Sequence, residues 1–278
     1  MKKIRIKLLS VLVFLGFVTH TNLALADSDL ERCSTLLNKQ SYDEAYNFCR
    51  NAAEQGSASA QLNLASMYYF GDGVTQDNAE AAMWVRAAAE QGDAEAQFEL
   101  GNMYFYGDGV IQDYAEAVRW YRAAAEQGNL RAQLRLGNSL YRHGIGGIAQ
   151  DSAEAVRWLV AAANQGSTYA QYVLGRIYRY GFLGIINHAE SASWFRAAAE
   201  QGYIEGQLAL GSMYAGGIGV IQDYALAHMW YNISARTGWD RAVKARFGIS
   251  QLMSNDQITQ AQALARQCLN SNYTDCGY

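Results

Sequence analysis

The sequence predicts an all-α fold, an α-solenoid of antiparallel helix pairs, and three observations support this. The motif A-A-E-Q-G, or a variant of it, ends at six glycines that are 36 residues apart, with one spacing of 38: Gly56, Gly92, Gly128, Gly166, Gly202 and Gly238. This period fits one helix, a turn, a second helix and a second turn. The chain contains no proline, and alanine-rich segments alternate with the glycines, so nearly everything outside the turns can be helical.

Residues 1–26 are predicted to be a cleavable signal peptide. A basic start is followed by an apolar stretch from Leu8 to Val18 and by small residues, with cleavage expected after Ala26. The stretch is shorter than the roughly 20 residues that cross a bilayer, so we expect a soluble, periplasmic or secreted protein with no membrane insertion after cleavage. Cleavage removes four basic side chains and leaves a formal net charge of -8. This charge disfavours a nucleic-acid partner, because phosphates require a cationic face.

Residues 27–56 are predicted to form an N-terminal capping helix pair, with Ser41 and Glu44 as a capping box at the second helix. Residues 239–278 are predicted to form C-terminal capping helices and a tail, the last helix being capped by Ser254 and Gln257.

All four cysteines lie in these two caps, two in each. An even number in an exported chain favours disulfides, although four cysteines permit three connectivities and free buried thiols are the alternative. Cys33 and Cys49 sit almost symmetrically about a turn between two helices, where facing positions come within disulfide range. We therefore expect one disulfide at each end of the solenoid, Cys33 with Cys49 and Cys268 with Cys276.

Five full repeats are predicted at residues 57–92, 93–128, 129–166, 167–202 and 203–238. A short polar residue that can cap a helix precedes the first helix of every repeat but the last, which has Tyr203: Ser57, Asp93, Asn129 and Ser167. The second helices begin with predicted capping boxes at Asp77, Asp113, Asp151 and Asn187, and with a simple cap at Asp223. A tryptophan recurs in each second helix before an alanine run, which predicts a bulky side chain beside a close helix contact: Trp84, Trp120, Trp158, Trp194 and Trp230.

The loops between the two helices carry G-x-G-V, whose glycines are predicted to have positive φ. A phosphate-binding loop would need a preceding strand and a G-K-[ST] ending, and neither is present. In the third and fourth repeats the loops are instead apolar, at residues 145–148 and 182–186. These apolar loops either seat a partner or pack against the neighbouring repeat.

The pattern A-x-A-Q-x-x-L-G-x-M-Y-x-x-G-x-G-V-x-Q-D-Y-x-x-A-x-x-W-Y-x-x-A-A-x-Q-G, clearest from Glu95 to Gly128, resembles the Sel-one-like repeat, a relative of the tetratricopeptide repeat. The resemblance covers residues 57–238. It implies an α-solenoid whose first helices line the concave side, and a role in protein–protein interaction or complex assembly. One exported branch of that family is linked to β-lactam hydrolysis and carries a cysteine pair in every repeat. This chain lacks those pairs, so the enzymatic implication transfers poorly.

Catalytic motifs are not found in the sequence, which contains no S-x-x-K, H-E-x-x-H or G-x-S-x-G. Three histidines follow the signal peptide, His143, His188 and His228, and they lie in different repeats without a second ligand nearby in the sequence. We therefore expect no enzymatic activity, no cofactor and no metal site.

The first helices carry the candidate binding surface. Positions four, five, eight and twelve of each repeat are nearly constant and mark a buried stripe, while positions three, seven, ten and fourteen vary and share the opposite face. Stacking of the repeats lays these variable rows side by side, and arginines with aromatic residues are typical of interfaces. A solvated helix face is the alternative. The candidate residues on this predicted concave face are Glu95, Glu99, Tyr106, Arg131, Arg135, Arg142, Tyr169, Arg176 and Tyr180.

The sequence as a whole favours an exported, non-catalytic scaffold that binds a protein or peptide on its concave face. A binder of peptidoglycan or other cell-wall fragments is the alternative, since carboxylated ligands pair with arginine rows and stack on tyrosines. An enzyme that acts on β-lactams or peptidoglycan is the third possibility.

Overall fold

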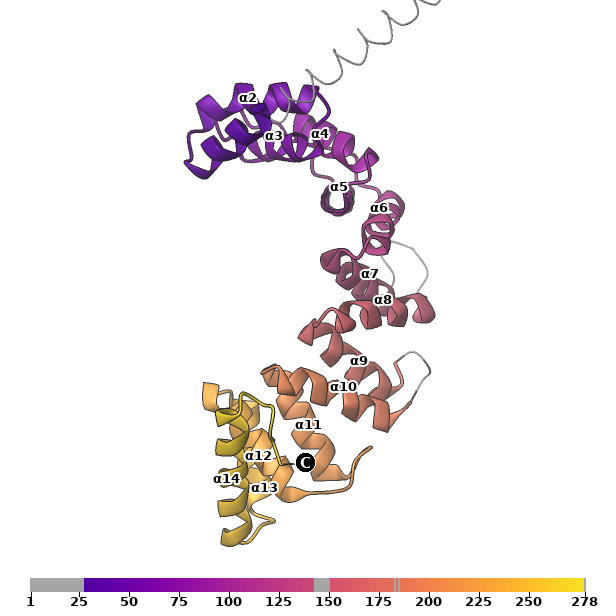
Figure 1. Ribbon diagram of the computed structural model, residues 1–278. Helices are drawn as coiled ribbons and strands as arrows, with labels where there is room; N and C mark the ends of the chain where they lie inside the picture. The colour runs from indigo at the N-terminus through magenta and orange to yellow at the C-terminus, as the bar shows by residue number, and fades with distance from the viewer. Residues whose placement is uncertain (1–27, 143–150, 183, 185, 278) are drawn as a thin grey trace, which may run out of the picture. The chain divides into compact units, whose positions relative to one another are not determined.

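The computed structural model describes residues 28–142, 151–182, 184 and 186–277, and within them it contains helices and no strand (Figure 1). The signal peptide, His143 and the loop at residues 145–148 lie outside the described residues, as do Leu183, Ile185 and the side chain of Arg142. In the described part, no helix combines the length and the apolar character needed to cross a membrane.

The chain forms two compact units, one up to Ala132 and one from Gln133 on. The first unit contains a helix at residues 28–38 and then α2 (Tyr42–Glu54), α3 (Ala58–Phe70), α4 (Asn78–Glu90), α5 (Ala94–Tyr106) and α6 (Tyr114–Glu126). The division falls within α7 (Leu130–Arg142). The second unit continues with α8 (Ser152–Asn164), α9 (Thr168–Tyr180), α10 (His188–Glu200), α11 (Ile204–Gly216), α12 (Tyr224–Ser234), the 3-10 turn η1 (Ala235–Thr237), α13 (Asp240–Ser250) and α14 (Asn255–Asn270).

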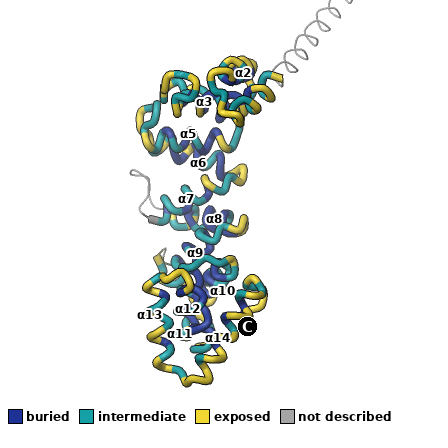
Figure 2. Tube along the Cα trace, turned by 90° about the vertical axis from the view of Figure 1, so that its left-hand side faces the viewer, coloured by how far each residue is buried: buried dark blue, intermediate teal, exposed yellow. Residues whose placement is uncertain are grey.

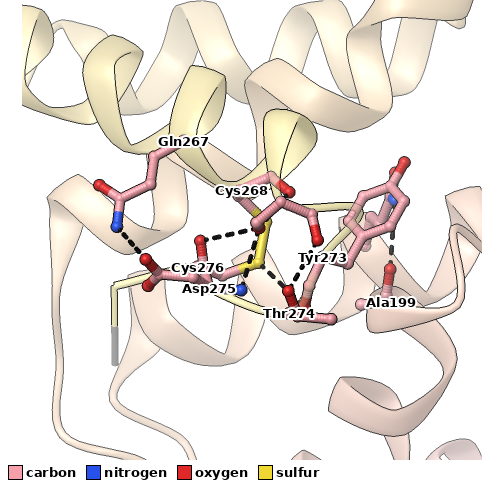
Figure 3. The surroundings of a disulfide bond; sticks show 9 residues. Ala199, Gln267, Cys268, Tyr273, Thr274, Asp275 and Cys276 are labelled. Carbon is pink, nitrogen blue, oxygen red and sulfur yellow. Dashed lines mark hydrogen bonds between the residues drawn. A yellow bond between two sulfur atoms is a disulfide. The ribbon is translucent and has the colours of Figure 1, made fainter.

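Successive helices from α2 to α6 and from α8 to α13 pack against one another, α14 packs on α12, and buried residues run along the sides on which the helices meet (Figure 2). The predicted α-solenoid of helix pairs is confirmed. The two predicted disulfides are also confirmed, Cys33 with Cys49 and Cys268 with Cys276. The second one holds the C-terminal tail, where the Gln267 amide donates to the Asp275 carboxylate at 2.6 Å (Figure 3).

Helix caps agree with the sequence in part. Asp77 accepts hydrogen bonds from the N–H groups of Ala79 and Glu80, and the four predicted caps of the first helices are present. The predicted capping box at Asp77 is wrong, because its own N–H donates to the Tyr68 carbonyl at 2.9 Å and needs no side chain from Glu80. The Ser41 box is also wrong, since the Ser41 side chain makes no cap hydrogen bond. The box of Ser254 and Gln257 is confirmed.

The G-x-G-V loops show why both glycines are present. Gly107 and Gly109 have φ of 77° and 71°, as predicted. A Cβ on Gly109 would lie 1.8 Å from the carbonyl oxygen of Asn78, so this loop packs directly on the backbone of the preceding repeat. The Gln112 amide then closes the loop by donating to the Phe105 carbonyl at 2.8 Å.

In four of the five repeats, the residue after the tryptophan makes the close contact with a glycine of the first helix. A Cβ on Gly101 of α5 would lie 2.6 Å from the ring of Tyr121, which is fully buried on α6. The same pairing recurs in the second unit, where Gly137 meets Leu159, Gly175 meets Phe195 and Gly211 meets Tyr231. The missing Cβ therefore makes room for a large side chain from the second helix.

A ladder of buried glutamines links successive repeats. The side chain of Gln97 donates to the Ala89 carbonyl of the preceding repeat at 3.3 Å and accepts from the Gln127 amide at 2.8 Å. Gln61 and Gln171 make the same two bonds with their own partners. The glutamines of A-Q-x-x-L and E-Q-G are therefore conserved between the repeats for one shared structural reason.

Replacing Gln97 by alanine is expected to lower the free energy of unfolding by about 1–3 kcal/mol, because one hydrogen bond to the preceding repeat, one hydrogen bond within the repeat and buried packing are lost. Gln112→Ala is the matched control, since its single hydrogen bond is exposed and its loss is expected to cost about 0.5 kcal/mol or less. Urea unfolding followed by circular dichroism measures both. Equal destabilisation by the two variants would contradict the ladder.

Candidate interaction surface

Three of the predicted surface residues meet in the first unit. The guanidinium of Arg131, in the first turn of α7, pairs with the carboxylates of Glu95 and Glu99 on α5, with 3.1 Å from its Nη1 to Oε1 of Glu99. The same guanidinium lies 4.5 Å from the ring centroid of Phe98, a buried residue of α5. Acidic side chains of the second repeat therefore form ion pairs with a basic side chain of the third repeat.

The pairing at Arg131 affects what this part of the face can bind. Two carboxylates surround one guanidinium, and the amides of Asn129 and Asn102 also donate to Glu95 and Glu99, at 3.1 and 3.0 Å. The Arg131 side chain is 52% exposed, and ion pairs this exposed to water typically contribute about 1 kcal/mol or less. An acidic ligand gains little here, because Arg131 already has two anionic partners.

Tyr106 occupies the last position of α5. Its side chain is exposed and its ring centroid lies 4.9 Å from that of Phe105. It can offer apolar contact area.

Four side chains of α9 and the loop after it form a continuous surface in the second unit, which we call the arginine–aromatic patch: Arg176, Arg179, Tyr180 and Phe182. The Phe182 ring centroid lies 5.4 Å from that of Tyr180 and 5.8 Å from the Arg176 guanidinium, and Arg179 lies 5.4 Å from the Tyr180 ring. Tyr180 and Phe182 are 55% and 48% exposed. The variable face of the helix and the apolar loop thus meet at Phe182.

The charges of the patch differ from those around Arg131. Neither Arg176 nor Arg179 forms an ion pair with any residue that the structure describes, and Arg179 donates instead to the Ser212 hydroxyl on α11 at 3.1 Å. Two guanidinium groups beside two exposed rings can pair with carboxylates while covering apolar side chains. This is the combination found at energetically important positions of interfaces.

The remaining predicted residues, Tyr169 and Arg135, lie on the first helices of the second unit. The Tyr169 hydroxyl donates to the Asn138 side chain on α7 at 3.3 Å, and Arg135 is partly buried on α7. Val173, at the variable position seven of the fourth repeat, is buried, so the prediction that it lies on an exposed face is wrong.

Two members of the patch were not among the predicted residues. Arg179 occupies position thirteen of its repeat, which is not one of the four variable positions of the predicted face. Phe182 lies in the loop after the end of α9. A signal was available in the sequence, since R-I-Y-R-Y-G-F concentrates arginines and aromatic residues within seven positions. Only the structure shows that they form one surface.

The histidines occupy different environments. His188 is exposed at the first position of α10, and His228 is buried within α12. The described residues contain no group of three side chains arranged to hold a metal ion.

Comparison with known proteins identifies relatives of the repeat. The Sel1 repeat family matches residues 39–57, 58–93, 94–129, 130–167, 168–203 and 204–238. The first of these matches overlaps the predicted N-terminal cap. No curated protein matches the sequence.

Many solved structures resemble the chain, and two of them are Sel1-type repeat proteins of similar size or sequence. A Sel1 repeat protein from Oxalobacter formigenes is 31% identical, with a TM-score of 0.64, over 88% of this chain and 96% of that one. The protective antigen c5321 of uropathogenic Escherichia coli, which displays an SLR fold, is 29% identical, with a TM-score of 0.49, over 89% of this chain and 62% of that one.

Proposed function

Because the chain belongs to the Sel1 repeat family, whose members are generally protein-interaction scaffolds, we propose that it binds a protein or peptide partner through the variable face of its first helices. In this proposal the chain acts by binding and not by catalysis. Its repeats hold the first helices side by side, so that one partner can contact several of them.

The arginine–aromatic patch is the observation that carries this proposal. It combines exposed rings with two guanidinium groups that have no carboxylate partner in the described part of the chain. The favoured partner therefore presents an acidic segment with apolar side chains next to it. The Arg131 network is a less favourable contact for the same segment, since its carboxylates repel it.

We also propose that the protein is exported and acts in the periplasm or outside the cell. The basic and apolar start of the sequence supports export. The two disulfides support it as well, because disulfides persist in oxidising compartments.

Replacing Arg176 and Arg179 together by glutamate is expected to lower recovery of the partner about tenfold or more from envelope extract, because two attractive charges become repulsive. Raising the salt concentration should also loosen the parent complex, since exposed charges are screened. Tyr180→Ala should weaken capture with little change in this salt dependence. Quantitative pull-down at several salt concentrations measures these effects.

Arg157→Glu is the matched control for this experiment. Arg157 also covers an aromatic ring, at 4.4 Å from Trp158, but it lies on α8, a second helix. All variants should melt within a few degrees of the parent, because the substituted side chains lie at the surface. Equal recovery by the parent and the patch variants would reject this surface as the binding site.

A further inference from the structure

The C-terminal cap contains an open groove. Helices α13 and α14 both pack on α12 (Figure 1). The groove between them has a volume of about 680 Å³. His228 and Asn232 of α12 line it, with Val243, Arg246 and Phe247 from α13 and Ile258 from α14. This volume lies within the roughly 300–1,000 Å³ of ligand sites.

One part of the groove is polar, and a buried nitrogen atom in it lacks a hydrogen-bond partner. His228 is only 3% exposed, and its Nδ1 has no hydrogen-bond partner. The Arg246 guanidinium donates to the Asn232 side chain at 3.0 Å and forms no ion pair with a described residue. A buried polar atom without a partner is costly, so this end of the groove favours a ligand that supplies one.

The charge of the lining indicates an anion. None of the described residues that line the groove is acidic, while Arg246 and Lys244 are cationic, and Lys244 is paired with Asp240 at 2.6 Å. Burial and the nearby Arg246 guanidinium lower the pKa of His228 below its usual value, so the imidazole is neutral near pH 7. In the tautomer with its proton on Nδ1, it can donate to a carboxylate oxygen.

The other part of the groove is apolar. Phe247 is 67% exposed, and Val243 and Ile258 lie beside it in the lining. The last repeat of a solenoid normally presents a polar outer face, because no further repeat covers it. An exposed phenylalanine at this place is therefore a contact surface for a ligand.

We propose that this groove binds the C-terminal residue of a peptide chain that ends in an apolar side chain. The terminal carboxylate pairs with Arg246 and accepts from His228, and the apolar side chain packs on Phe247 and Ile258. The end of a peptide chain fits better than an internal segment, because the carboxylate must be small enough to reach the buried imidazole of His228. The site is separate from the arginine–aromatic patch.

Binding of acetyl-Ala-Ala-Leu with a free carboxylate to the purified protein tests this proposal, with the C-terminal amide of the same peptide as the comparison. The acid is expected to bind about tenfold or more tightly than the amide, because only the acid offers an anion to Arg246. In nuclear magnetic resonance titrations, the His228 imidazole signals should move with the acid and not with the amide.

Three variants complete the experiment. Arg246→Gln should remove the preference for the acid, whereas Arg241→Gln on the same helix should keep it, because Arg241 lies over Trp239 and does not line the groove. Phe247→Ala should weaken both peptides and keep the preference, and this exposed site leaves the fold intact. Patch variants at Arg176 should bind like the parent.

Three results would overturn the proposal. These are equal binding of acid and amide, no binding of either, and an unchanged preference in Arg246→Gln.

Discussion

Replacing Tyr121 by alanine is expected to lower the free energy of unfolding by about 3–5 kcal/mol, the range found when a buried aromatic residue is truncated. The ring is fully buried against Gly101, and its hydroxyl donates to the Asn102 side chain at 2.9 Å. Alanine leaves a cavity that two helices cannot close, because the helix pair is also held by its loop and by neighbouring repeats. Urea unfolding followed by circular dichroism measures the loss.

A double-mutant cycle shows whether the glycine and the ring act as a pair. Gly101→Ala should cost about 1–3 kcal/mol through overpacking, offset in part by the better helix propensity of alanine. Adding Tyr121→Val reproduces the pair Ala65 and Val85 of the preceding repeat, both buried in one cluster. We expect the double variant to be more stable than the sum of the single changes predicts, by about 0.5–3 kcal/mol. Additive losses would contradict the pairing.

Deleting residues 93–128 as one repeat is expected to leave a folded, less stable protein. Each repeat contacts mainly its neighbours, so the new neighbours can repeat the same contacts. The buried glutamine of the following repeat, Gln133, would meet equivalent backbone groups of residues 57–92. Far-ultraviolet circular dichroism and thermal melting should show a cooperative transition at a lower temperature.

Deleting half a repeat, residues 111–128, should abolish cooperative melting. The deletion removes α6 and leaves α5 without the large side chain that fills the space beside Gly101. It also reverses the direction in which the following helices run, because helices of a pair alternate. If both deletions caused equal damage, the assignment of the repeat boundaries would have to be revised.

Local signals explain why so much of the fold could be predicted. The N-caps at Asp93 and Asp77, the positive φ of Gly107 and the pairing of Cys33 with Cys49 depend on residues that lie near one another in the sequence. The capping box predicted at Asp77 failed for a non-local reason. The N–H of Asp77 is taken by the carbonyl of Tyr68, and this depends on how the loop between them closes.

The candidate surface could be predicted less well, because side chains of different helices decide its charge. Glu95 and Arg131 are separated by a whole repeat, and only their positions in space show that they form an ion pair. The sequence predicts that Phe182 lies in a loop. In the structure its ring also contacts Tyr180 and Arg176, so it extends the exposed face of α9.

The sequence by itself determined the repeat, the helix pairs, the caps of the first helices and the two disulfides, since these follow from spacing and from short-range hydrogen bonding. Only the tertiary structure decided which charges are neutralised within the chain, which ring fills the space beside Gly101, and that α12, α13 and α14 leave a groove beside His228. Such contacts join side chains that are distant in sequence, and helix periodicity alone does not specify the distances between them.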